Sequence, residues 1–268
     1  MSRLEEGGRV DPASIQSPYE RALLARHIFA YCWVTGHFIK EGDKVLEIGC
    51  GEGYGSAIIA KKAGRVTAVD TAKDTVLHAA AKYAAVNLDF LVHDGVRLPF
   101  PDAGFDIAVS FQVIEHIADT AAFVREAARV LKPGGRLYLT TPNRVHRLKE
   151  GQKPWYKFHV REFSAAELPA VLSPFFGRCE VKFITVPQEY YEMEKKVARI
   201  ATLAQKLDPL GLRNLVPYSF KQAVFGLISR KSEPGKFEPK ASDFSVINED
   251  RNGLDLWIEA ALCPPGKE

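Results

Sequence analysis

The stretch Lys44–Ser56, KVLEIGCGEGYGS, has the residue types and spacing of a ligand-binding turn. It begins with a short apolar run that is typical of a buried strand in a parallel sheet, and a helical pattern follows it. Glycines between a strand and a helix let backbone N–H groups approach a ligand, and the start of a helix favours an anionic group. Glu47 adds a carboxylate, which suits a ligand with a cationic amino group better than a pyrophosphate. The glycines stand at Gly49, Gly51, Gly53 and Gly55.

Two acidic residues end the next predicted strands. Asp70 ends the predicted strand of residues 65–70, about twenty residues beyond the glycines, where a carboxylate can accept hydrogen bonds from both hydroxyls of a ribose. Asp94 ends a third strand that starts at Leu88. A ribose-binding acid serves NAD and S-adenosylmethionine equally, so Asp70 indicates a nucleoside without choosing between the two. A solvated surface carboxylate is the alternative interpretation.

The glycine spacing argues against a dinucleotide site. The dinucleotide fingerprint is G-x-G-x-x-G. Counted from Gly49 its last position is Tyr54, and counted from Gly51 it is Ser56. A nicotinamide-dependent dehydrogenase therefore remains only as a weaker alternative, and a turn that merely joins a strand to a helix is another.

The elements that position these residues alternate along the chain. A helical pattern covers residues 18–37, where Leu23, Leu24, Ile28, Tyr31 and Val34 recur at helical spacing, and we expect this helix to lie across the ligand end of the sheet. Alternating strands and helices predict a parallel α/β sheet. The further predicted strands cover 106–110, 136–140, 178–186 and 254–263, and the further helices 75–83, 113–117 and 123–130, with another opened by Ser164 and Glu167.

Composition fits one large domain or one domain with an insertion. The 268 residues are 46% apolar and 26% charged, and the net charge of +3 does not by itself indicate nucleic-acid binding. The four cysteines are scattered without metal-ligand spacing, which predicts free thiols, a reducing compartment and no metal site. The first residues lack the apolar core of a signal peptide, and the apolar run 28–39 is too short to span a bilayer. We therefore expect a cytoplasmic protein.

Several ordered motifs together resemble the class I S-adenosylmethionine-dependent methyltransferases. They are the spacing E-x-G-x-G-x-G, two acids at strand ends, VHDGVRLPFPDAGFDIAVSFQVIEHI, and ARVLKPGGRLYLTTPN. The resemblance covers most of the predicted nucleotide-binding half. Residues 151–168, GQKPWYKFHVREFSAAEL, further resemble a segment of bacterial methyltransferases that act on small metabolites and envelope sugars.

The resemblance implies a doubly wound, Rossmann-like sheet of seven strands, the last antiparallel, with helices on both faces. The length and helical periodicity of residues 187–247 predict, in addition, a helical insertion between strands six and seven. Together they divide the chain into an N-terminal helical cap (1–40), a cofactor-binding core (41–186), an insertion or lid (187–247) and a final strand (248–268). The resemblance implies S-adenosylmethionine as cofactor. The residues expected to bind it are Glu47, Gly49, Cys50, Gly51, Gly53, Tyr54, Asp70, Thr71, Asp94, Gly95, Phe111, Gln112 and Glu115.

Two histidines are candidates for removing a proton from the methyl acceptor. His116 follows Glu115 just after the fourth strand, close to the methyl group that the resemblance implies, and His159 lies on the substrate side of the fifth strand. An alcohol must lose its proton to accept a methyl group, and a histidine titrates in the range suited to that step. We hypothesise that His116 is the base and that Glu115 orients it or contacts the cofactor. Either histidine also fits a structural role.

The insertion is the part of the chain with the strongest charge. Residues 190–240 contain ten Lys or Arg and five Asp or Glu, and two amphipathic helices are predicted, from Met193 to Leu207 and from Phe220 to Ile228. The charges indicate either solvated helix faces or contact with an anionic, lipid-linked or membrane-bound substrate.

We therefore expect a class I methyltransferase that O-methylates a small molecule, such as a metabolite or an envelope sugar or lipid precursor. The alternative from another class is a protein that binds S-adenosylmethionine without catalysis, as a partner or sensor. No nucleic-acid partner is expected, because the chain reads Ser-Phe-Gln-Val after the fourth strand where amino-methylating enzymes of nucleic acids have Asn/Asp-Pro-Pro-Tyr/Phe.

Overall fold

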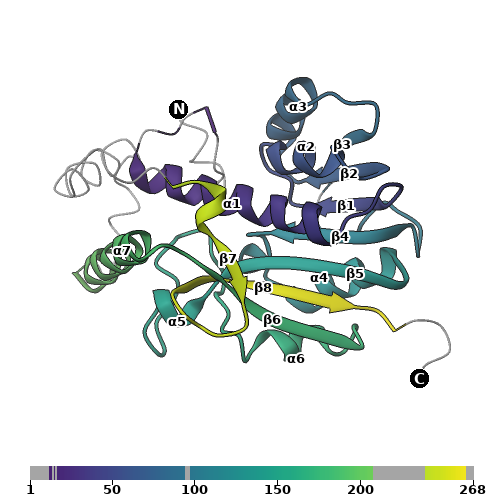
Figure 1. The fold of residues 1–268 in the computed structure, drawn as a ribbon. Helices are drawn as coiled ribbons and strands as arrows, with labels where there is room; N and C mark the ends of the chain where they lie inside the picture. The colour runs from purple at the N-terminus through teal and green to yellow at the C-terminus, as the bar shows by residue number, and fades with distance from the viewer. Residues whose placement is uncertain (1–11, 14, 16, 94–96, 208–238, 264–268) are drawn as a thin grey trace.

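The structure is a computed structural model that describes residues 12–13, 15, 17–93, 97–207 and 239–263. An eight-stranded sheet in the order β3-β2-β1-β4-β5-β8-β6-β7 runs through its centre (Figure 1). The strands from β3 to β5 in this order are parallel, and β8 is antiparallel to both of its neighbours. The strands are β1 (Lys44–Ile48), β2 (Arg65–Asp70), β3 (Leu88–Val92), β4 (Phe105–Phe111), β5 (Leu131–Pro142), β6 (Arg178–Thr185), β7 (Ser245–Ile247) and β8 (Gly253–Ala261).

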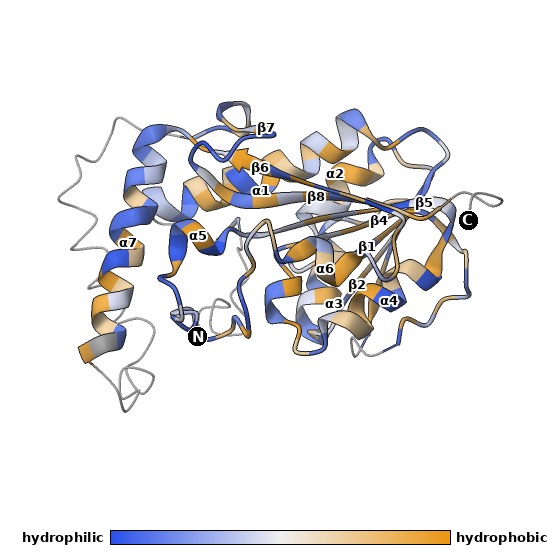
Figure 2. Cartoon of the chain, turned by 90° about the horizontal axis from the view of Figure 1, so that it is seen from below, coloured by the Kyte–Doolittle hydropathy of each residue, from blue (hydrophilic) through white to orange (hydrophobic). Residues whose placement is uncertain are grey.

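Helices cover both faces of this sheet. One hydrophobic cluster joins α1 and α2 to one face, and a second cluster joins α4 and α6 to the other. In Figure 2 the helices on the sheet carry both apolar and polar residues, whereas α7 is mostly hydrophilic. The helices are α1 (Pro18–His37), α2 (Tyr54–Ala60), α3 (Lys73–Lys82), α4 (Thr120–Val130), α5 (Arg144–Arg147), α6 (Leu168–Leu172) and α7 (Gln188–Leu207), with short 3₁₀ turns at Ile114–His116 and Ala241–Asp243.

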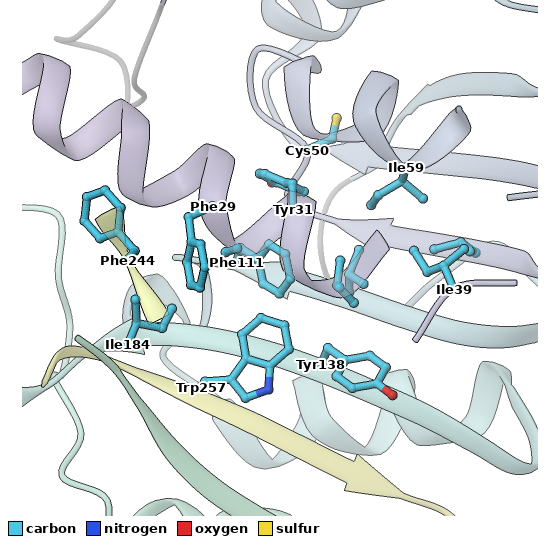
Figure 3. Close-up of a cluster of buried hydrophobic side chains, with 14 of the residues drawn as sticks. Phe29, Tyr31, Ile39, Cys50, Ile59, Phe111, Tyr138, Ile184, Phe244 and Trp257 are labelled. Carbon is cyan, nitrogen blue, oxygen red and sulfur yellow. The ribbon is translucent and has the colours of Figure 1, made fainter. Parts of the chain in front are cut away.

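Helix α1 is an integral part of the core. Its start is fixed by a capping box, in which Ser17 accepts from the backbone N–H of Glu20 and the Glu20 carboxylate accepts from Ser17. Aromatic side chains of α1 pack on the strands, among them Phe29 and Tyr31 near Phe111 and Trp257 (Figure 3). The helix has the predicted bounds, 18–37.

The buried face of α1 also carries charge. The side chains of Arg26 and Asp255 are 3% and 2% exposed, and Arg26 Nε lies 3.1 Å from Asp255 Oδ2 on β8. Glu194 on α7 lies 3.7 Å from the same guanidinium group. Helix α1 is therefore joined to strand β8 by an ion pair as well as to the sheet by apolar packing.

Three expectations about the elements need correction. The sheet has eight strands instead of seven, because residues 245–247 pair with β6 as an edge strand although they were assigned to the insertion. Three residues are too few for an alternating pattern to be visible in a sequence. The helix expected at 113–117 is a 3₁₀ turn, and β5 begins at Leu131, five residues before its expected start, with an irregular register.

The predicted insertion is described only in part. Its first predicted helix lies within α7, whereas the second, at 220–228, lies outside the described residues. The domain boundaries stay a prediction. None of the helices that the structure describes is long and apolar enough to cross a membrane.

We predict that Arg26→Met lowers the free energy of unfolding by about 3–5 kcal/mol, because it leaves the buried carboxylate of Asp255 without its cation. Urea denaturation would measure this change. Replacing both partners, as Arg26→Met with Asp255→Leu, should recover part of the loss.

The matched control is Arg251→Met, which breaks an ion pair with Glu249 whose side chains are 77% and 69% exposed. It should change stability by less than about 0.5 kcal/mol. An equally small effect of Arg26→Met would contradict a structural role for the buried pair.

Candidate functional site

The site lies where the strand order reverses. Strand β1 pairs with β2 on one side and with β4 on the other, and all three are parallel. In open α/β sheets, ligands bind beyond the carboxyl ends of the strands at this switch point. Residues that follow Ile48, Asp70 and Phe111 are therefore brought to one edge of the sheet.

The glycine turn after β1 takes backbone conformations that favour glycine. Gly49, Gly51 and Gly53 have φ angles of 84°, 50° and 79°. A Cβ atom on Gly49 would lie 2.4 Å from a methyl group of Val113, and one on Gly55 would lie 2.1 Å from the ring of Tyr31. The turn is thus closed in by the segment after β4 and by α1, and a larger residue would displace one of them.

Glu47 is buried beneath this turn. Its side chain accepts hydrogen bonds from the hydroxyl of Tyr31, at 2.7 Å, and from that of Ser56. Burial raises the pKa of Glu47 to about 7 despite these two hydrogen bonds. The carboxylate predicted to face a ligand therefore also joins α1, β1 and α2.

Asp70 holds the same turn from the neighbouring strand. Its carboxylate accepts from the backbone N–H of Gly51 at 2.9 Å and from that of Ala72 at 3.0 Å. The bond from Gly51 joins the ends of β1 and β2 on the side where the ligand is expected. The predicted neighbour Thr71 is exposed beside it.

Gln112, directly after β4, has a φ angle of 58°, which is uncommon outside glycine and is often found at functional sites. Its backbone N–H donates to the carbonyl of Thr140, and its side chain donates to the hydroxyl of Thr140 at 3.2 Å. Strand β5 thus holds the turn in this conformation.

Glu115, His116 and His159 form a compact group on the acceptor side. One carboxylate or ring atom from each lies within 4.8 Å of those of the other two. The two imidazole rings meet edge to face with their centroids 4.9 Å apart. Glu115 is fully buried, and Thr141 donates to its Oε2 at 3.0 Å. Burial raises the pKa of Glu115 to about 8.

Both histidine rings are oriented through Nδ1. His116 Nδ1 lies 2.9 Å from the carbonyl of Phe158, and His159 Nδ1 lies 2.8 Å from Glu162 Oε1. Arg147 Nε donates to the other oxygen of Glu162 at 3.1 Å. Burial lowers the pKa of His159, although Glu162 opposes the shift. The structure therefore brings together two histidines that stand far apart in the sequence.

The remaining predicted site residues have the following places. Cys50 is buried, and its backbone N–H donates to the carbonyl of Val69. Tyr54 opens α2, and its hydroxyl lies 3.0 Å from His27 Nδ1. Phe111 is buried at the end of β4 against Tyr31. Asp94 and Gly95 lie outside the described residues.

Four charged residues of this region were not predicted as site residues. Arg26, Arg147, Glu162 and Glu194 connect the acceptor side to α1, α5 and α7. Arg26 could have been singled out from the sequence, because it lies in a mostly apolar stretch of the first helix. So could Glu162, which stands three residues after His159.

The chain is similar in sequence to known methyltransferases. A family model described as a methyltransferase domain matches residues 46–139. A probable S-adenosylmethionine-dependent methyltransferase of Mycolicibacterium smegmatis is 47% identical over 132 residues, which are 49% of this chain and 50% of that protein. The ubiquinone biosynthesis O-methyltransferase of Xanthomonas oryzae pv. oryzae is 36% identical over 189 residues, which cover 63% of this chain and 75% of that enzyme.

The extent of these matches differs between relatives. The chain spans about half the length of the mycobacterial relatives that it matches. Among solved structures, the YcgJ protein of Bacillus subtilis aligns with a TM-score of 0.55 and 20% identity, over 88% of this chain and 99% of that protein. At this identity the likeness concerns the fold alone.

We predict that Glu47 makes stability fall as the pH rises from about 4.5 to about 7. In this range the folded protein keeps a proton on Glu47 that the unfolded chain has released, so unfolding becomes easier with rising pH. Within this range the titration of Glu47 lowers the free energy of unfolding by up to about 1.4 kcal/mol per pH unit, and Glu47→Gln should remove this contribution. Urea denaturation at several pH values would measure the difference from wild type.

Glu249→Gln, at a side chain that is 69% exposed, is the control and should leave the pH profile unchanged. Parallel profiles of Glu47→Gln and wild type would contradict the raised pKa.

Proposed function

Because the chain belongs to the class I family of S-adenosylmethionine-dependent methyltransferases, we propose that it transfers a methyl group to a hydroxyl of a small-molecule acceptor. The observation that carries this proposal is the pairing of β1 with β4. It brings the glycine turn, which follows β1, to the same edge of the sheet as Glu115 and His116, which follow β4. A cofactor turn and groups able to assist proton removal thus share one switch point.

The family's cofactor fits the turn. Gly49 and Gly51 have positive φ angles, and Gly49 packs against Val113 with no room for a Cβ atom, so the turn needs glycine to keep the shape in which its backbone N–H groups can face a ligand. We assign the cofactor's amino group to the turn beside Glu47 and its ribose to Asp70. The adenine is assigned to the segment of Asp94 and Gly95, and the methionine part to Phe111 and Gln112. Cys50, Gly53, Tyr54, Thr71 and Glu115 complete the proposed cofactor contacts.

S-adenosylmethionine supplies a methyl group on a positively charged sulfur. In the transfer the S–CH₃ bond breaks and its electron pair stays on sulfur, while an O–CH₃ bond forms and the hydroxyl proton is released. The protein's part is to align the reactants, exclude water and assist the loss of that proton. We assign the last task to His116 and His159, whose rings are held through Nδ1.

The acceptor is proposed as a metabolite or an envelope sugar or lipid precursor. The name of the Xanthomonas relative supports transfer to oxygen. The sequence of residues 190–240, with ten basic and five acidic residues, supports an anionic or lipid-linked acceptor. The proposal of a reducing, cytoplasmic location rests on the scattered spacing of the four cysteines in the sequence.

We predict that S-adenosylhomocysteine at a hundred times its dissociation constant raises the melting temperature by roughly 5–10 °C. Such a ligand stabilises the folded state by about 2.7 kcal/mol. NADH at the same concentration is the control and should produce no shift. A shift with NADH alone would overturn the cofactor assignment, and a shift with S-adenosylhomocysteine but no transfer to any hydroxyl acceptor would favour a binding protein without catalysis.

We predict that His116→Ala lowers kcat by about 10²–10⁴-fold once an acceptor is identified, because the loss of the hydroxyl proton is no longer assisted. The affinity for S-adenosylhomocysteine should stay near that of wild type. His78→Ala, at a half-buried position on α3, is the matched control. Full turnover of His116→Ala at saturating substrate would refute the assignment.

A further inference from the structure

We propose that Glu115, His116 and His159 bind a divalent transition-metal ion on the acceptor side of the site. The sequence predicts no metal site, because two of these ligands are adjacent and the third lies far along the chain. In the fold their ligand atoms come within 4.8 Å of one another. Around one ion, with bonds of about 2.0–2.2 Å, ligand atoms lie roughly 3–4 Å apart. Small side-chain rotations would therefore close the group onto a metal.

The surroundings of the histidines match those of metal ligands. Histidines that bind a metal through one ring nitrogen usually donate from the other to a carboxylate or a backbone carbonyl. Here Nδ1 of His159 faces Glu162, and Nδ1 of His116 faces the carbonyl of Phe158. When Nδ1 carries the hydrogen, Nε2 carries the lone pair that a metal requires. The hydrogen bond from Thr141 likewise fixes Glu115 through Oε2.

Glu115 supplies a second, independent observation. Glu115 is fully buried, and its Oε1 has no hydrogen-bond partner among the described residues. A buried carboxylate oxygen without a partner is costly, and a cation coordinated there would remove that cost. Oε1 is thus the carboxylate atom that we assign to the metal.

The charges around the group also call for a cation. Three other buried carboxylates of this region lie against guanidinium groups: Asp255 against Arg26, Glu162 against Arg147, and Glu194 against both. Among the described residues Glu115 has no ion pair of this kind. A metal ion bound there would supply the positive charge that the other three carboxylates already have.

The donor set indicates the class of metal. Two imidazole nitrogens and one carboxylate oxygen suit Zn²⁺, Co²⁺, Mn²⁺ or Fe²⁺, whereas Mg²⁺ prefers oxygen ligands alone. Three protein ligands leave at least one coordination position open. Only the chemical role of the ion rests on the proposed function. With the ion bound, the histidines would act as its ligands instead of as bases, because their Nε2 lone pairs are used. The ion would then assist the loss of the proton by lowering the pKa of an acceptor hydroxyl at the open position, with the proton passing to solvent before the oxygen takes the methyl group.

Titration of the full chain, first treated with a chelator, with Co²⁺ alone would test this site through the visible absorption of the bound ion. We expect one equivalent to bind. His159→Ala and Glu115→Gln should each weaken binding by more than about 100-fold, because each removes a ligand. Glu162→Gln should weaken it by about 10–100-fold, because it removes only the hydrogen-bond partner of His159.

The matched control is His37→Ala, which removes an exposed histidine at the end of α1 and should leave Co²⁺ binding unchanged. Far-UV circular dichroism and urea denaturation of every variant show whether it is folded. Co²⁺ binding that His159→Ala and Glu115→Gln leave unchanged, or no binding by wild type, would overturn the metal site. If the wild-type protein responds to S-adenosylhomocysteine but binds no Co²⁺, the metal site is refuted and the proposed function is not. If it binds Co²⁺ but does not respond to S-adenosylhomocysteine, the proposed function is refuted and the metal site is not.

Discussion

The need to pair buried carboxylates shapes the edge of the sheet where the strands end. Glu47 is bonded to Tyr31 and Ser56, and Asp255 lies against Arg26. An unpaired charge in such a position costs several kcal/mol, so each carboxylate fixes the element that supplies its partner. Helix α1 is fixed twice in this way, once to β1 and once to β8. It therefore belongs to the site as much as to the core.

The two halves of the site differ in how far the sequence determines them. On the cofactor side, the glycine turn and Asp70 lie at the ends of strands whose apolar runs are visible in the sequence, and local spacing predicts both elements and their order. On the acceptor side, His116 and His159 meet only because β4 and the segment after β5 end at the same edge. Both histidines were predicted as candidates one by one, but a contact between distant segments leaves no local pattern, so their meeting could not be predicted. The link to Glu162 is local, because Glu162 stands three residues after His159.

Helix α1 illustrates a further limit of periodicity. Its bounds are predicted correctly, yet Leu23, Leu24 and Ile28 are only half-buried, whereas the alanines at 22, 25 and 30 and the charged Arg26 face the core. Small side chains let the helix approach its neighbours closely, and a charge is tolerated there because it has partners. Hydrophobicity alone would place the two leucines and the isoleucine in the core, and the alanines and Arg26 nearer the surface. Strand β7, with only three residues, shows the same limit for strands.

The position of β8 between β5 and β6 has a consequence for how the protein reaches its fold. Leu139 on β5 pairs with Ile258, and Val181 on β6 pairs with the same residue from the other side. Until β8 has emerged from the ribosome, both strands present unpaired edges, and their halves of the sheet are not joined. Such edges can pair with other chains. Pairing across a long sequence separation is also slow. Folding during translation should therefore remain incomplete until this strand is released, and chaperones that shield strand edges would act in that interval.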